Sequence, residues 1–116
     1  MEHLLTRKDE ELMDRAALKN NLHEVVFLES IGGFTRKYCV NGRELLVESG
    51  INHMEQILPH DKFFKINDSF IINADYLKRI KANATKNAIL HGGIELRIAQ
   101  DKYWEFVSFL RFKYKI

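Results

Sequence analysis

The sequence predicts a mainly β domain of antiparallel strands in small packed sheets, with a short internal helix, a C-terminal helix and an N-terminal helical extension. Short apolar runs recur from His23 onward, and turn-forming residues separate them every few positions. Two stretches, one at each end of the chain, instead repeat their apolar residues at helical spacing. A chain of 116 residues that is 46% hydrophobic suits one globular domain. We expect this domain over residues 23–116, where the short apolar runs lie, and an extension or linker over residues 1–22.

The N-terminal helix is expected over residues 6–19. Thr6 is followed three residues later by Asp9, which is typical of a capping box, and apolar residues then recur near helical spacing as far as Asn20. The apolar stripe of this helix is thin. Two interpretations therefore stay open: a solvated helix that packs loosely on the domain, or a connector or dimerisation arm.

The first part of the domain reads as strands. A short apolar strand is expected near residues 25–28, and two more are expected over 34–40 and 43–48, on either side of Asn41-Gly42. An Asn-Gly pair between strand-like runs is a strong hairpin signal, because both central residues of a type I′ turn need positive φ. We therefore expect a hairpin with a type I′ turn.

A two-turn helix is expected next, over residues 51–58. Ser49 is predicted to cap its first turn, and Pro59 is predicted to end it. Short apolar runs separated by polar turns then indicate further strands. These strands are expected at 63–66, 70–73, 77–82, 86–90 and 94–98.

A longer helix is predicted over residues 101–115, where apolar residues recur at helical spacing. We expect this helix to pack on the sheet. Trp104 and the phenylalanines of the helix are interpreted as core residues rather than as platforms for stacking nucleic-acid bases.

Charge and cysteine content exclude several classes of protein. The net charge is only +2, and residues 23–116 carry fourteen basic and eleven acidic side chains. This surplus supports nucleic-acid binding only if the cations share one face. Cys39 is the single cysteine, so no disulfide forms within the chain, and we interpret it as a small buried hydrophobe. Neither a membrane-spanning run nor a signal pattern is visible, which makes the cytoplasm the expected location.

Residue patterns that carry enzymatic chemistry are missing. The five histidines have no metal-ligand spacing on a common helix face, and no nucleophile elbow, P-loop or dinucleotide fingerprint occurs. We expect no enzyme, no cofactor and no metal.

Residues 63–80 read FFKINDSFIINADYLKRI, which places a polar loop between two apolar strands. This stretch resembles the central motif of the LytTR-type DNA-binding domain, which has the form FxRxHxSxxVN followed by an I-x-x-I segment. Lys65, Ser69, Ile72 and Asn73 stand where that pattern has Arg, Ser, Val and Asn. The order of strands and helices from His23 onward is also similar to that family.

The resemblance implies that DNA is read through three loops rather than through a helix. The loops lie before the second strand, inside the central motif and at the start of the terminal helix. The residues at the corresponding positions are Thr35, Arg36 and Lys37; Lys65, Asn67, Asp68 and Ser69; and Gln100 with Lys102.

Several of these positions depart from the family pattern. Lys65 replaces an arginine and keeps a point charge for phosphate. Asn67 and Gln100 are amides that suit adenine, and Asp68 can accept a hydrogen bond from the amino group of cytosine but is repelled by phosphates. We interpret Asp68 as a change of specificity. For Asn73, a structural role in fixing the turn is favoured over contact with DNA.

The leading hypothesis is a sequence-specific DNA-binding transcriptional regulator, either stand-alone or the effector domain of a response-regulator-type protein. Its expected partner is double-stranded DNA, and the resemblance implies a homodimer on DNA. No membrane or small-molecule partner is expected. The alternative is a protein-interaction module that kept the fold and lost DNA reading, which Asp68, Ala99 and Gln100 together favour.

Overall fold

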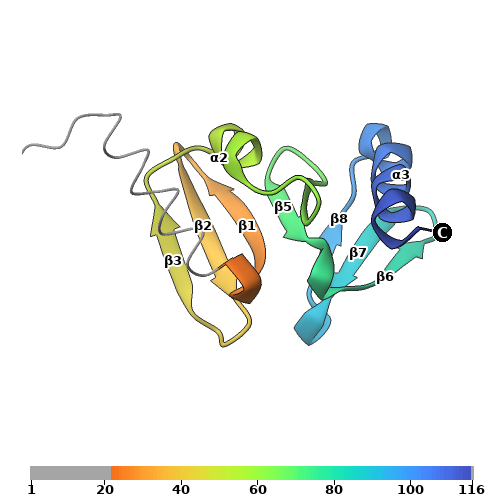
Figure 1. The fold of residues 1–116 in the computed structure, drawn as a ribbon, viewed down its shortest axis with the longest axis horizontal. Coiled ribbons are helices and arrows are strands. Elements are labelled where there is room, and N and C mark those ends of the chain that lie inside the picture. Colours follow the sequence, from red (N-terminus) through yellow and green to blue (C-terminus); the bar gives the residue numbers. More distant parts are fainter. Residues whose placement is uncertain (1–21, 116) are drawn as a thin grey trace, which may run out of the picture.

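The computed structural model describes residues 22–115, which fold into two antiparallel sheets with two α-helices (Figure 1). The larger sheet has the strand order β3-β2-β1-β5-β4 and the smaller one β6-β7-β8. The strands are β1 (Val25–Ile31), β2 (Phe34–Cys39), β3 (Glu44–Val47), β4 (Phe63–Lys65), β5 (Phe70–Asn73), β6 (Leu77–Ala82), β7 (Lys86–Leu90) and β8 (Glu95–Arg97). The helices are α2 (Ile51–Ile57) and α3 (Tyr103–Tyr114). The predicted fold class is confirmed, while the helix expected over 6–19 lies outside the described residues.

Two hydrophobic clusters lie on opposite faces of the larger sheet. One is formed with α2 and includes Leu28 and Ile71; the other is formed with the smaller sheet and α3 and includes Phe27 and Ile72. Neighbouring residues of β1 and β5 divide between the clusters because successive side chains of a strand point to opposite faces. The centre of the larger sheet is therefore covered on both sides, which explains the unbroken apolar run at the start of β1.

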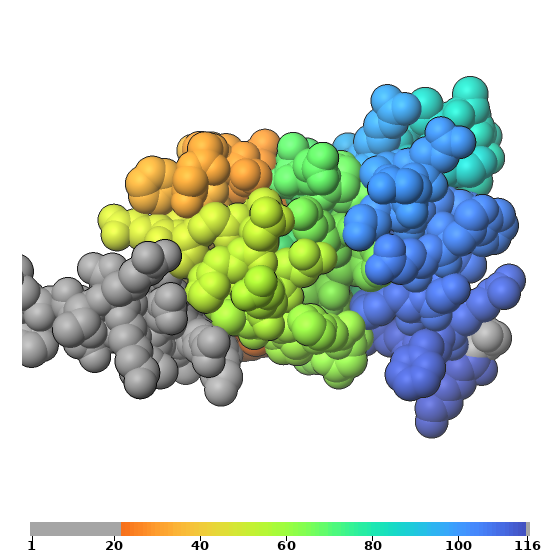
Figure 2. Space-filling model, turned by 90° about the horizontal axis from the view of Figure 1, so that it is seen from above, coloured from red at the N-terminus to blue at the C-terminus, as the bar shows by residue number. Residues whose placement is uncertain are grey.

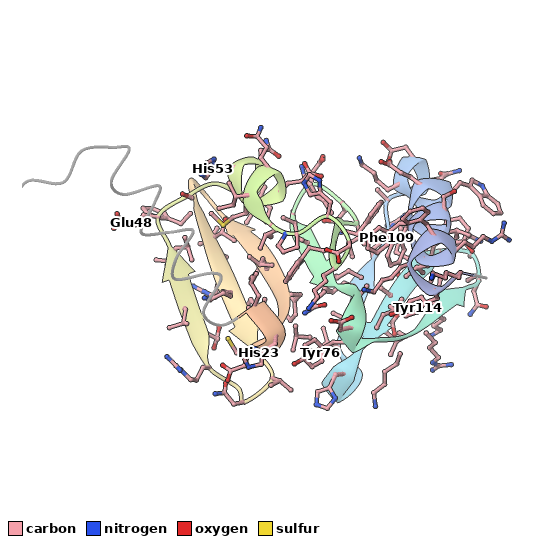
Figure 3. The ribbon with its side chains drawn as sticks, viewed as in Figure 1. His23, Glu48, His53, Tyr76, Phe109 and Tyr114 are labelled. Carbon is pink, nitrogen blue, oxygen red and sulfur yellow. The ribbon has the colours of Figure 1, made fainter. Side chains whose placement is uncertain are left out.

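Two short 3₁₀ helices, η1 (Leu22–Glu24) and η2 (Ala74–Tyr76), lie at the edge of the molecule where the two sheets are joined. The hydroxyl of Tyr76 donates to the carbonyl of His23, and these two residues face one another in Figure 3. The buried Asn73 amide donates to the Val25 carbonyl at 2.8 Å and accepts from the backbone N–H of Asp75 at 3.0 Å. Asn73 therefore has the structural role that was expected of it.

The β2–β3 hairpin is present, but its predicted turn type is wrong. Gly42 has a φ of 87°, whereas Asn41 does not have positive φ. Four residues, 40–43, separate the strands, and the Asn41 side chain accepts a hydrogen bond from the Arg43 backbone at 3.0 Å. A type I′ turn needs positive φ at both central residues, so a looser turn with a single glycine bend connects the strands.

The predicted N-cap of α2 is also wrong. Gly50 rather than Ser49 occupies that position, and it offers no side-chain cap. The Ser49 carbonyl instead accepts a hydrogen bond from the Thr35 hydroxyl at 2.7 Å, which ties the loop before α2 to β2. The helix ends before Pro59, as predicted.

Helix α3 packs on the smaller sheet as predicted, through one face only. Phe106 is fully buried, whereas Trp104 is 71% exposed and Phe112 is 89% exposed. The interpretation of these two residues as core is therefore wrong. At 100° per residue, positions two before and six after Phe106 point away from the sheet. Cys39 is buried, which confirms its expected role, and burial raises the pKa of its thiol.

Candidate nucleic-acid interface

Three chain segments meet at the edge of the molecule opposite Tyr76. They are the turn between β1 and β2, the loop between β4 and β5, and the segment that leads from β8 into α3. The backbone N–H of Ser30 donates to the Ser69 carbonyl at 2.8 Å, and that of Ala99 donates to the Ile66 carbonyl at 2.8 Å. The middle loop is thus bonded to a neighbour on each side. Seen from above, the three tips, in orange, green and blue, cross one face of the molecule (Figure 2).

Asn67 organises the middle loop. Its side-chain oxygen accepts hydrogen bonds from the backbone N–H groups of Ser69 at 2.7 Å and Phe70 at 2.9 Å. Its side-chain nitrogen donates to the Arg97 carbonyl at 2.6 Å. Because both ends of the amide are bonded to the backbone, the expected contact between Asn67 and adenine does not match this conformation. The side chain shapes the loop and ties it to β8 instead.

The middle loop also presents polar groups to solvent. Asp68 and Ser69 are exposed at its tip. Lys65 precedes the loop, and its ammonium group donates to the side-chain oxygen of Asn52 on α2 at 2.7 Å. This bond holds the lysine near the tip while leaving it partly exposed.

The first tip offers fewer side chains than expected. Along β2, Thr35 is 0% exposed and Lys37 is 2% exposed, so burial removes these two from the candidate DNA contacts. The reason is strand alternation, which turns both toward the α2 side of the sheet together with Cys39. Arg36 points to the other face and remains a candidate.

Arg36 is held within a small polar network. It lies 3.9 Å from the Glu44 carboxylate, and its hydrogen bond with Tyr38 raises the pKa of the guanidinium. The Tyr38 hydroxyl donates in turn to Glu29 at 2.7 Å. Arg36 is thus a permanent, partly exposed cation near the first tip.

The burial of Lys37 leads to a prediction about stability. Burial lowers the pKa of its ammonium group, because transfer of a charge from water is unfavourable. We expect Lys37→Met, which keeps the length of the side chain, to raise the free energy of unfolding by about 1 kcal/mol at neutral pH. Chemical denaturation measures this change. Lys81→Met, on the exposed face of β6, is the control and should change stability by less than about 0.5 kcal/mol.

The pH dependence of stability provides a second check on Lys37. Above its lowered pKa the folded protein binds fewer protons than the unfolded chain, so wild-type stability rises relative to Lys37→Met as pH approaches the ordinary lysine value of 10.5. A difference between the two proteins that stays constant with pH would contradict this account.

The third tip opens α3. Gln100, a predicted DNA contact, is exposed. Lys102 is partly buried, and its ammonium group lies 3.6 Å from the Glu105 carboxylate. Since both partners are accessible, this ion pair is weak and Lys102 can exchange it for a phosphate.

Two further cations, which are not among the predicted DNA contacts, lie at this edge. Arg97 is exposed at the end of β8, next to the Asn67 side chain that bonds its carbonyl. Lys86 begins the neighbouring strand, and its ammonium group lies 5.4 Å from the centre of the Tyr103 ring. Strand alternation could have identified Arg97 from the sequence, because this residue stands between Leu96 and the buried Ile98 and so must point outward.

The remaining basic residues of the smaller sheet lie apart from the tips. Lys78, Arg79 and Lys81 are exposed on β6, which is an edge strand. Within residues 22–115, no group of three or more histidine, cysteine or acidic side chains is arranged to hold a metal ion, and no helix is long and apolar enough to cross a membrane.

Comparisons with known proteins identify the family and the fold. No curated protein matches the chain. A solved structure that matches is the LytTr DNA-binding domain of a Bacillus cereus protein described as a methyl-accepting/DNA response regulator. It shares 22% identity, covers 76% of this chain and 82% of its own, and superposes with a TM-score of 0.68, which shows a common fold. A family model of the LytTr DNA-binding domain matches residues 16–111, so the chain belongs to the LytTR DNA-binding domain family.

Proposed function

We propose that this protein is a sequence-specific transcriptional regulator, stand-alone or as the effector domain of a response-regulator-type protein, and that it reads double-stranded DNA with its three joined tips. The observation that carries the proposal is the pair of backbone hydrogen bonds, from Ser30 to Ser69 and from Ala99 to Ile66, which place the tips on one edge. Family membership supplies DNA as the ligand. Such a function belongs in the cytoplasm.

The cations of this edge are assigned to phosphates. Lys65, Arg97 and Lys102 flank the middle and third tips, and Arg36 lies beside the first. Contacts of this kind fix position on the duplex without reading sequence. Asp68 and Glu105 also lie here and oppose the phosphate field, so the edge is only mildly positive and we expect moderate affinity.

The exposed polar side chains at the tips are assigned to base edges. Gln100 can bond adenine in the major groove, Asp68 can accept from the amino group of cytosine, and Ser69 can do either. Asn67 has a different role, because its amide is used to hold Ser69 and Phe70 in place.

A salt-dependent titration tests the proposal. With about four phosphate contacts, the logarithm of the association constant is expected to fall with the logarithm of salt concentration at a slope of about −3.6. Fluorescence anisotropy with a pool of mixed duplexes at several salt concentrations measures this slope. The absence of any salt-dependent association would contradict DNA binding and favour a protein-interaction module on the same scaffold.

Single substitutions separate positioning from base reading. Lys65→Ala is expected to weaken binding to every duplex alike and to reduce the salt slope by about 0.9, because one phosphate contact is lost. Gln100→Ala is expected to change the ranking of duplexes, since a bidentate amide contributes about 1–3 kcal/mol of discrimination. Binding to duplexes selected from a random pool measures both effects.

Arg43→Ala is the matched control, because Arg43 is an exposed cation in the β2–β3 turn, at the end of β2 away from the tips. It should change neither the slope nor the ranking. Equal losses from Lys65→Ala and Gln100→Ala on all duplexes would overturn the two roles.

A further inference from the structure

Positive charge is concentrated on the smaller sheet. Its strands and connecting turns, residues 77–97, contain five lysines and arginines but a single acidic residue, Glu95. This surplus of four exceeds the net charge of the whole chain, which is +2. A local excess of one sign on so small a sheet favours an anionic partner. The five cations are Lys78, Arg79, Lys81, Lys86 and Arg97.

These cations are not neutralised by neighbouring side chains. Within residues 22–115, none of the five forms an ion pair with a carboxylate. Cations elsewhere on the described surface do form such pairs, as Lys62 and Lys113 do with Asp75. The charge of the smaller sheet is therefore available to a ligand.

Strand pairing sets some of these cations in a row on the outer face of the sheet. Lys81 on β6 pairs with Asn87 on β7, and Asn87 pairs with Arg97 on β8. Directly paired residues share a face of the sheet, and the other face, which carries the fully buried Ala88, packs in the core. Arg79 stands two residues before Lys81 and so lies on the outer face as well. Arg79, Lys81 and Arg97 are all exposed.

The row begins at the edge that carries the three tips. The Asn67 side chain bonds the Arg97 carbonyl at 2.6 Å, so β8 is the strand next to the middle loop, and β6 is the far edge of the sheet. Figure 2 shows the same order, because the β6–β7 hairpin, in cyan, lies beside the blue tip at the end of the line of tips. The cations of β6 therefore extend this edge in one direction only.

Lys86 holds the end of the hairpin against the third tip. Its carbonyl accepts a hydrogen bond from the Ile98 backbone at 2.8 Å. Its ammonium group lies 3.4 Å from the Asn83 carbonyl in the β6–β7 turn and 5.4 Å from the centre of the Tyr103 ring at the start of α3. The outer face of the hairpin thus has a fixed position relative to the tips.

We propose that the outer face of the smaller sheet binds the phosphate backbone of DNA that flanks the sequence read by the three tips, through Arg79 and Lys81. This proposal rests on the proposed function, because the tips place the duplex beside β8. Neighbouring strands lie about 4.8 Å apart, so Lys81 is about 10 Å from Arg97, which corresponds to about three base-pair steps of 3.4 Å. Contacts of this kind add affinity without reading bases.

Protection of an edge strand from pairing with another chain also places lysines on strands such as β6. That role does not require Lys81 to stand in line with Arg97, and it does not require the line to start at the tips. A polymer of regularly spaced negative charges satisfies the whole row. Duplex DNA bound at the tips is such a polymer, and it already lies at the start of the row.

Duplexes that differ only in their flanks test the proposal. Fluorescence anisotropy compares a duplex that just covers one selected site with duplexes extended at one end or the other by about ten base pairs, one helical turn. We expect extension at only one of the two ends to raise the affinity about five- to tenfold at low salt. The same extension should steepen the salt slope by about 1.8, because two phosphate contacts are added.

A double variant, Arg79→Gln with Lys81→Gln, should lose this gain. Its affinity for the short duplex and its ranking of sites should stay within about twofold of wild type, because neither residue touches the sequence that is read. The matched control is Arg43→Gln with Arg111→Gln, which removes two exposed cations from the β2–β3 turn and from α3. The control has the same net charge as the double variant and should keep the gain.

Four outcomes would overturn the inference: no gain from either extension, an equal gain from both, a gain that the double variant keeps, or a gain that the control loses equally. The last would show that net charge matters rather than position. All four include binding of the short duplex, so they leave the proposed function in place. Absence of association with any duplex would instead contradict the proposed function, and this inference with it.

Discussion

Phe106→Ala is expected to lower the free energy of unfolding by about 4 kcal/mol. The Phe106 ring is fully buried, and its centre lies 4.9 Å from that of Phe64 on β4 and 6.2 Å from that of Phe109 on the same helix. The substitution leaves a cavity at the point where α3, β4 and the smaller sheet meet. Urea denaturation followed by circular dichroism measures the loss.

Phe112→Ala is the matched control for this prediction. It removes the same side chain from the same helix, but Phe112 is 89% exposed, so the change in stability should stay within about 0.5 kcal/mol for the monomer. Because Gln100 and Lys102 lead directly into α3, Phe106→Ala should also weaken DNA binding. Similar losses of stability in the two variants would contradict the assignment of one helix face to the core.

Three consecutive strands could be predicted from the sequence to the residue, whereas β1, expected near residues 25–28, extends to Ile31. The bounds of β5, β6 and β7 agree with those expected, because polar or glycine-containing turns separate their apolar runs. β4 is one residue shorter than expected at its end, and β8 is one residue shorter at each end. Their C-terminal limits lie where the loop between β4 and β5 bonds the segment after β8. Local pattern therefore predicts where a strand lies better than where its hydrogen bonds stop.

The face that β2 buries could not be predicted in this way. Alternation shows that Thr35, Lys37 and Cys39 share one face, but it does not show that a face with a hydroxyl and an ammonium group points inward. Composition favours the opposite choice, because lysine is rarely buried. Which face of β2 is buried is determined by the position of α2, and that position depends on chain connections outside β2.

The role of Asn67 also depends on contacts that are distant in sequence. Its position in the motif identifies a polar loop, but its bond to the Arg97 carbonyl joins residues thirty positions apart. No local pattern indicates that the side chain has a backbone partner on β8. The motif alone therefore predicts that the Asn67 amide contacts DNA, whereas in the folded protein this amide is hydrogen-bonded to the backbone.

Asn67→Ala is expected to weaken DNA binding more than tenfold on every duplex and to lower the free energy of unfolding by about 2 kcal/mol. Three hydrogen bonds are lost, two within the loop and one to β8. The tip that carries Asp68 and Ser69 then loses its fixed position relative to Arg97. Anisotropy titrations and denaturant unfolding measure the two effects on the same preparation.

Asn67→Asp separates the two functions of the side chain. A carboxylate still accepts from the N–H groups of Ser69 and Phe70, so the loop keeps its internal bonds and the loss of stability should be smaller than for alanine. It cannot donate to the Arg97 carbonyl, and it adds a negative charge to the edge, so DNA binding should fall at least as far as in Asn67→Ala. If Asn67→Ala instead preserved stability and changed only the preferred duplex, the amide would be contacting a base, and the assignment of Asn67 to loop architecture would be wrong.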